Sequence, residues 1–259
     1  MRSLYLKAIR EPGQTLLTTV SRLIVLGFVL SPVASAPQNA EPPEQIEWTW
    51  EVRPPHPDPK LPNVLLLGDS ISRDYFPIVA ERLGRIANVY LMASSASVGD
   101  KRLVREIREF GSMEAVRFSV VHFNNGMHGW DYGEEQYKAS FPGFVRAARK
   151  LAIRHGVLIW ASTTPVKSDA KDGPTNGRID ARNAIAASLV RSASIGSDDQ
   201  HTLMLQHQDQ HTDPVHFDIH GAELQGDQAA AVIKSALSSK RWEIKTGIGS
   251  DRAAQGDLR

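Results

Sequence analysis

The chain has 259 residues, 41% of them hydrophobic and 23% charged, and a formal net charge of +1 at pH 7. These values are typical of a globular protein, and the length suits one domain with extensions. The near-zero charge gives no electrostatic footprint for nucleic acid, so we expect no nucleic-acid partner. The sequence contains no cysteine, which excludes disulfides, a thiolate nucleophile and a cysteine-based zinc site.

The first 36 residues have the pattern of a secretory signal peptide. Basic residues between Arg2 and Arg22 precede the apolar run 23–30, and the small residues Ala34-Ser35-Ala36 follow it. The run is shorter than the about 20 apolar residues that a membrane span needs. We therefore predict a cleaved leader over 1–36, an exported protein that is periplasmic or secreted, and no stable membrane insertion after cleavage. An uncleaved anchor next to the membrane is the alternative.

Residues 37–62 are predicted to form a linker or arm. Eight prolines fall in this range, a density typical of extended linkers. Within it, residues 46–52 alternate between apolar and polar, which predicts an edge strand. Trp48 and Trp50 in this strand admit two interpretations, stacking on a sugar or packing of the arm against the main domain. We favour packing.

Residues 63–238 are predicted to form the main domain, followed by a polar tail over 239–259. Four apolar residues between Asn63 and Gly68 predict a short strand that is buried on both faces. Further strands are predicted at 88–92, 118–123, 157–160 and 203–205, and helices at 75–83, 101–110, 134–155, 179–190 and 224–237. This alternation predicts one three-layer α/β/α sandwich with a central parallel sheet.

Candidate chemical groups lie at two distant places in the chain. Ser70 follows the first strand in a strand-to-helix turn, at the sheet edge where open α/β folds bind ligands. Asp213 precedes His216 by three residues on a turn that contains Pro214, so its carboxylate can reach Nδ1 while Nε2 faces a serine. A serine hydroxyl needs such a base, and the base needs such an orienting group.

Acyl transfer also requires hydrogen-bond donors for the developing oxyanion. Three donors follow adjacent predicted strands: the Ser70 backbone N–H, the Gly99 backbone N–H, and the side-chain amide of Asn124 or Asn125. A glycine is suited to this role because no Cβ intrudes beside its N–H. Asp69 and Asp100 are predicted to brace their turns through local hydrogen bonds rather than to take part in chemistry.

Four short segments together resemble the SGNH (GDSL-type) hydrolases, which are serine esterases and lipases with a flavodoxin-like α/β/α sandwich. In chain order they are Gly68-Asp69-Ser70, Ser97-Val98-Gly99-Asp100, Asn124-Asn125-Gly126 and Asp213-Pro214-Val215-His216. The resemblance spans about residues 63–237. It implies Ser70 as the nucleophile, His216 as the base and Asp213 as its orienter. It also implies Ser70, Gly99 and an asparagine as oxyanion donors.

The third segment departs from the family pattern. It reads Phe-Asn-Asn-Gly-Met-His over 123–128, where the family has Gly-x-Asn-Asp. The resemblance therefore leaves open which asparagine faces the oxyanion. We favour Asn124, because a branch of the superfamily with a Phe-Asn-x-Gly-Leu-His segment looks similar, and keep Asn125 as the alternative.

These observations predict an exported serine esterase that acts on acyl esters, with short-chain and acetylated carbohydrate esters favoured. His128 and Trp130 are candidate substrate-binding residues, and we expect no cofactor. A carbohydrate O-acyltransferase and a lysophospholipase or lipase-type acyl hydrolase are alternatives on the same residues. A sugar-binding module without catalysis is disfavoured, because it has no need of an Asp–His pair.

A metal site is the remaining alternative. Five histidines gather late in the sequence among aspartates, at 201, 207, 211, 216 and 220. Their spacing matches no zinc motif. We therefore expect no bound metal.

Overall fold

The computed structural model describes residues 46–250, and side chains over 46–239. One sheet has the strand order β1-β3-β2-β4-β5-β6. The strands are β1 (Thr49–Val52), β2 (Asn63–Gly68), β3 (Asn88–Ser94), β4 (Phe118–Phe123), β5 (Ala152–Ala161) and β6 (Gly196–Asp198). Strand β1 is antiparallel to β3, and all other pairs are parallel. Without β1, the order by sequence is 2-1-3-4-5, which is the flavodoxin-like order.

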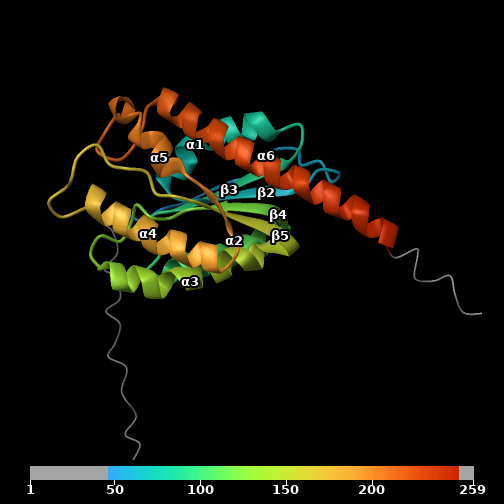
Figure 1. Cartoon of the computed structure of the whole chain (residues 1–259), viewed down its shortest axis with the longest axis horizontal. Coiled ribbons are helices and arrows are strands. Elements are labelled where there is room, and N and C mark those ends of the chain that lie inside the picture. Colours follow the sequence, from blue (N-terminus) through green and yellow to red (C-terminus); the bar gives the residue numbers. More distant parts are fainter. Residues whose placement is uncertain (1–45, 251–259) are drawn as a thin grey trace, which may run out of the picture. The chain divides into compact units, whose positions relative to one another are not determined.

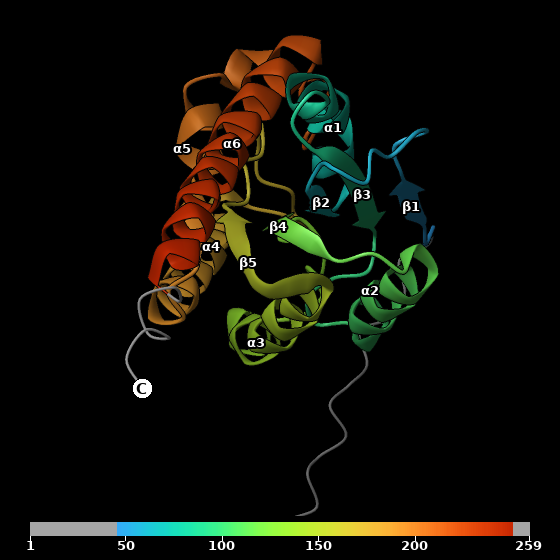
Figure 2. The same cartoon turned by 90° about the vertical axis from the view of Figure 1, so that its right-hand side faces the viewer.

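Helices cover both faces of this sheet (Figures 1 and 2). They are α1 (Ser70–Leu83), α2 (Lys101–Glu114), α3 (Glu134–Leu151), α4 (Asn176–Ser192), α5 (Gln200–Leu205) and α6 (Ile219–Ser250), with a 3-10 turn at Gln208–Gln210. Helices α1 and α6 pack on the face that contains Val64 and Leu66. Helices α2 and α3, with the second half of α4, pack on the face that contains Leu65 and Leu67. The predicted three-layer sandwich is therefore confirmed.

Helices α1 and α6 approach each other closely on their shared face. A Cβ built on Gly226 of α6 would lie 2.6 Å from Cβ of Ile78 on α1, a distance that side chains do not tolerate. The glycine therefore sets how near α6 can lie to the helix that begins at Ser70.

The predicted fifth strand is wrong. Residues 203–205 belong to α5, because Asp199 caps a helix there by accepting a hydrogen bond from the Thr202 N–H at 3.1 Å. The true fifth parallel strand is β6, which pairs with β5. Its sequence Gly-Ser-Asp contains no apolar residue, so hydrophobic periodicity cannot find it.

Several predicted boundaries shift. Helix α3 ends at Leu151, and the chain enters β5 at Ala152 rather than continuing helically to 155. Helix α1 begins at Ser70 rather than near residue 75. Helix α6 begins at Ile219 and continues to Ser250, beyond both ends of the helix predicted at 224–237. The predicted edge strand of the arm is confirmed as β1.

The predicted leader over 1–36 lies outside the described residues. Within residues 46–250, no helix combines the length and the apolar character needed to cross a membrane.

Candidate active site

Ser70 lies at the carboxyl edge of the sheet, directly after β2 and Asp69. Strand β2 lies between β3 and β4, at the point where the strand order reverses and where open α/β sheets bind ligands. The turn is tight. A Cβ on Gly68 would lie 2.1 Å from Oγ of Ser72 and 3.0 Å from the carbonyl oxygen of Asn124, so only glycine fits.

Asp69 begins the helix that carries Ser70. Its Oδ1 accepts the backbone N–H of Ile71 at 3.1 Å, and this caps α1. Asp100 does the same for α2 by accepting the Arg102 N–H at 2.7 Å. Both predicted turn-bracing roles are confirmed.

Ser70, His216 and Asp213 lie in one hydrogen-bonded line. Nε2 of His216 is 2.7 Å from Oγ of Ser70, and Nδ1 is 2.8 Å from Oδ2 of Asp213. An ionised carboxylate only accepts hydrogen bonds, so it selects the tautomer with the proton on Nδ1. In this tautomer Nε2 is free to accept the serine proton. The structure thus brings together three residues, the outermost of which lie 146 positions apart in the chain.

Asp213 is held in place by its own backbone turn. Its Oδ1 accepts the N–H groups of Val215 and His216, both at 2.7 Å. Burial raises the pKa of Asp213, but these two N–H groups and the His216 side chain outweigh it and hold the pKa below its ordinary value. The carboxylate therefore stays ionised beside the imidazole at neutral pH.

The two candidate asparagines point to different parts of the site. Nδ2 of Asn124 donates to the carbonyl of Ala161 at 2.6 Å and to Oγ1 of Thr163 at 3.1 Å. Both of its amide hydrogens are thus committed inside the protein. Nδ2 of Asn125 donates one hydrogen bond, to the carbonyl of Ser94 at the end of β3, at 3.3 Å. Asn124 therefore has no amide hydrogen left for an oxyanion, whereas Asn125 has one. This geometry favours Asn125, the alternative assignment, and the identity of the oxyanion donor stays a prediction.

Gly99 also differs from the prediction. Its N–H donates to the hydroxyl of Tyr132 at 2.9 Å instead of facing open space. A Cβ at position 99 would lie 2.6 Å from the Tyr132 ring, so the ring packs directly against the glycine. While Tyr132 stays in this position, the Gly99 N–H is occupied.

Arg182 organises the loop between β4 and α3, and sequence reasoning assigned it no role. Its guanidinium is buried and donates to the carbonyl groups of His128 at 2.9 Å and Gly129 at 2.5 Å. Burial lowers the pKa of Arg182. Its position is a signal in the sequence, since Arg182 lies on the same helical face as the buried Ile179 and Ala186.

The predicted substrate-binding residues are packed against the protein. The Trp130 ring lies over Arg182, with 4.1 Å between the guanidinium carbon and the ring centroid, and its Nε1 donates to the carbonyl of Met127 at 2.7 Å. The His128 ring contacts the Trp48 ring edge-on, with centroids 6.2 Å apart. A role for Trp130 and His128 in binding substrate stays a prediction.

The N-terminal arm packs beside the helix that begins at Ser70. The rings of Trp48 and Trp50 lie 5.4 and 5.5 Å from the guanidinium carbon of Arg73, three residues after Ser70, at distances typical of cation–π contacts. Packing of the arm, the favoured interpretation, is confirmed. Trp50 remains 51% exposed, so one aromatic surface faces solvent.

The late histidines do not converge. Within the described part of the chain, no group of three or more His, Cys, Asp or Glu side chains is placed to hold a metal ion. His211 stacks on Phe217, His201 contacts Asp180, and His216 faces Ser70. The three histidines with these contacts therefore face different partners.

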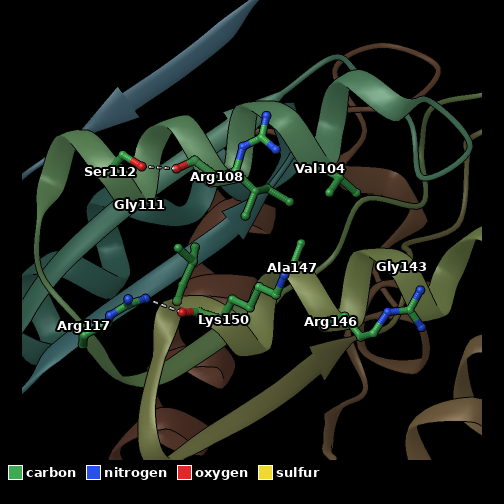
Figure 3. A pocket seen from close by; sticks show the side chains of 11 residues that line it. Val104, Arg108, Gly111, Ser112, Arg117, Gly143, Arg146, Ala147 and Lys150 are labelled. Atoms are coloured by element: carbon green, nitrogen blue, oxygen red, sulfur yellow. Dashed lines mark hydrogen bonds between the residues drawn. The ribbon is translucent and has the colours of Figure 1, made fainter.

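A cavity of about 470 Å³ lies away from these residues, between α2 and α3 (Figure 3). Four basic side chains line it, from Arg108, Arg117, Arg146 and Lys150. None of the candidate site residues contributes to it. This cavity is therefore not part of the candidate active site.

No family model matches the chain, and no curated protein matches it. Solved structures do. A lipolytic G-D-S-L family protein from Veillonella parvula DSM 2008 is 16% identical with a TM-score of 0.54, over 66% of this chain and 98% of its own. A lipase/acylhydrolase from Enterococcus faecalis is 16% identical with a TM-score of 0.56, over 68% and 96%. The fold is that of the GDSL-type hydrolases.

A third match has a different printed activity. The C-terminal catalytic domain of peptidoglycan O-acetyltransferase A from Streptococcus pneumoniae is 19% identical with a TM-score of 0.51, over 69% of this chain and 96% of its own. Identities this low establish the GDSL-type fold and no more. The roles of individual residues must be argued from their geometry.

Proposed function

We propose that this protein is an exported serine esterase that hydrolyses short-chain acyl esters, acetylated carbohydrates among them, through an acyl-enzyme on Ser70. The hydrogen-bonded line from Ser70 through His216 to Asp213 carries the proposal. A base and an orienting carboxylate in this arrangement are what a serine hydroxyl needs to become a nucleophile. The GDSL-type fold supports the same chemistry.

In the proposed reaction, Oγ of Ser70 attacks the ester carbonyl while Nε2 of His216 takes the hydroxyl proton. Asp213 stabilises the imidazolium that forms and does not itself become protonated. When the tetrahedral intermediate collapses, His216 gives the proton to the leaving alcohol. Water then attacks the acyl-serine with His216 as base, and this releases the carboxylic acid and restores Ser70.

The proposed oxyanion site uses the Ser70 N–H, at the first residue of α1, and the Asn125 amide. Donors aimed at the developing charge are each worth about 2.7–4 kcal/mol, and a helix N-terminus favours negative charge. The Gly99 N–H joins them only if the Tyr132 hydroxyl gives way to the oxyanion.

Sugar substrates are supported by the arm. Trp48 and Trp50 pack against Arg73 one turn after Ser70. Trp50 remains half exposed, and its open aromatic face suits stacking against a sugar ring. Export rests on the leader pattern over 1–36.

Transfer of an acyl group to a sugar is the second candidate function. The likeness to a peptidoglycan O-acetyltransferase domain favours it. The same acyl-serine would then react with a sugar hydroxyl in place of water. The two outcomes differ in the exclusion of water and the binding of an acceptor.

The test is a panel of aryl esters of increasing acyl length and of acetylated oligosaccharides, each with and without an unacetylated acceptor sugar. We expect hydrolysis of acetyl and butyryl esters that falls with longer chains and is lost in Ser70→Ala. Acetyl transfer to the acceptor, detected by mass spectrometry, would favour the second candidate. A Ser70→Ala protein that hydrolyses esters at the wild-type rate would contradict both.

A further inference from the structure

A small polar cavity lies beneath the turn that carries Ser70. Asp69 at the end of β2, Thr164 after β5, Gln200 of α5 and Gln225 of α6 contribute to its lining. It has room for the centre of one water molecule, about 10 Å³, and this is the smallest space in which a buried water is found.

Four polar atoms of the lining have no hydrogen-bond partner among the described residues. They are Oδ2 of Asp69, Oγ1 of Thr164, Oε1 of Gln200 and Nε2 of Gln225. Each of these residues is at most 2% exposed. Buried polar groups are nearly always hydrogen-bonded, to protein or to ordered water. Four unpaired atoms around one cavity therefore point to a shared partner inside it.

The chemistry of the four atoms matches water. Asp69 and Gln200 offer acceptors, Gln225 offers a donor, and the Thr164 hydroxyl can do either. The Gln200 amide is fixed in orientation, because its Nε2 donates to Oδ2 of Asp198 at 2.9 Å and to the carbonyl of Gln225 at 3.1 Å. Water has two hydrogens to donate and two lone pairs that accept. The lining can satisfy all four.

We propose that this cavity is a binding site for a single structural water molecule. The water donates to Asp69 Oδ2 and Gln200 Oε1, and it accepts from Gln225 Nε2 and Thr164 Oγ1. Because Oδ1 of Asp69 already accepts the Ile71 N–H, the water connects the other oxygen of that carboxylate to the segment after β5, to α5 and to α6. Thr164 and Gln225 are thus positioning residues for the Ser70 turn, a consequence that rests on the proposed function.

A high-resolution crystal structure of the full chain tests the site itself. We expect one ordered water within about 2.7–3.2 Å of all four atoms, and none in the isosteric double variant Thr164→Val/Gln225→Met. Rotation of Gln225 to pair directly with Gln200, with no density in the cavity, would overturn the proposal. So would a peak bound only by oxygens at distances too short for hydrogen bonds, since that is a cation.

Kinetics with an aryl acetate test the positioning role. We expect Thr164→Val to lower kcat about tenfold with KM unchanged, in line with a small misplacement of a reacting group, and Thr164→Ser to restore the rate. Equal rates in the wild type and Thr164→Val would overturn the positioning role. The two ideas fail separately. A water seen in the crystal alongside an active Ser70→Ala enzyme refutes only the proposed function, whereas an empty cavity alongside an inactive Ser70→Ala enzyme refutes only the water site.

Discussion

Two of the histidine–aspartate pairs among the described residues have the same contact distance and opposite surroundings. In both pairs, His216–Asp213 and His122–Asp198, the closest nitrogen and oxygen are 2.8 Å apart. The side chains of the first pair are 31% and 47% exposed, and those of the second are 1% and 0% exposed. The first pair has a serine hydroxyl on its other nitrogen. In the second pair, Gln200 and Gln228 donate to the carboxylate.

This comparison shows that a close His–Asp contact does not by itself mark a reactive site. An exposed pair of this kind contributes little to stability, so folding alone does not account for the ordered geometry around His216. A buried pair is sustained only when further hydrogen bonds satisfy it. The two glutamine amides do this for Asp198. Access to solvent and a serine hydroxyl on the second nitrogen distinguish the pair that we propose to be reactive.

The largest effect that we predict is on the exposed pair. His216→Ala should lower kcat for an aryl acetate by about 10⁴- to 10⁶-fold, as expected when one member of a catalytic unit is removed. The free energy of unfolding should change by no more than about 0.5 kcal/mol, because the site is at the surface. Steady-state kinetics and urea unfolding measure the two quantities. A large loss of stability with retained turnover would reverse the roles given to the two pairs.

The matching substitution in the buried pair should act on stability instead. His122→Ala removes one of the hydrogen-bond partners of the buried Asp198 carboxylate, and we expect a loss of about 3–5 kcal/mol in the free energy of unfolding. Urea unfolding measures it, and the exposed His155 provides the control His155→Ala, with little change expected. Active-site titration should show that the fraction still folded turns over normally.

The adjacent residues Asn125 and Asn124 are also expected to differ, one in its effect on turnover and the other in its effect on stability. Asn125→Ala should slow turnover by about 10²- to 10³-fold as one oxyanion donor is lost, with the fold retained. Asn124→Ala should cost about 1–3 kcal/mol of stability, because the Ala161 carbonyl loses its partner. If Asn124→Ala slows the reaction that much without loss of stability, the assignment of Asn125 is wrong.

The smallest predicted effect depends on pH. Burial raises the pKa of Asp198, but contacts with His122, Gln200 and Gln228 outweigh it and hold the pKa below its ordinary value. A lowered pKa adds stability above the unfolded-state pKa of about 3.9, and this stability is lost as the pH falls through the folded-state pKa. The advantage of the wild type over Asp198→Asn in urea should therefore shrink from pH 6 to pH 3. A constant difference would exclude this linkage.

Much of the fold follows from the sequence because its central strands carry a strong local signal. The apolar run before Gly68, bounded by turn residues, predicted a strand buried on both faces, and β2 confirms it and places Ser70 at the carboxyl edge of the sheet. The contact between Ser70 and His216 followed from two motifs and the parallel topology. Strand β6 was not predicted, because its sequence Gly196-Ser197-Asp198 has no apolar pattern.

The details of the oxyanion site could not be predicted for a different reason. The two asparagines are adjacent, and what separates them is the distant carbonyl that each amide meets, Ala161 for one and Ser94 for the other. The occupation of the Gly99 N–H depends on Tyr132, 33 residues away. Such choices are made by tertiary packing, which no local pattern encodes.

Through the close contact at Gly226, a position far from the candidate site can affect the geometry of that site. Ser70 begins α1, and His216 lies just before α6, so the gap between hydroxyl and imidazole follows the spacing of these two helices. A methyl group added at position 226 would push α1 and α6 apart without contacting Oγ of Ser70 or Nε2 of His216. A substitution at position 226, in the outer helical layer of the sandwich, could therefore change the reaction rate while Ser70, Asp213 and His216 stay the same.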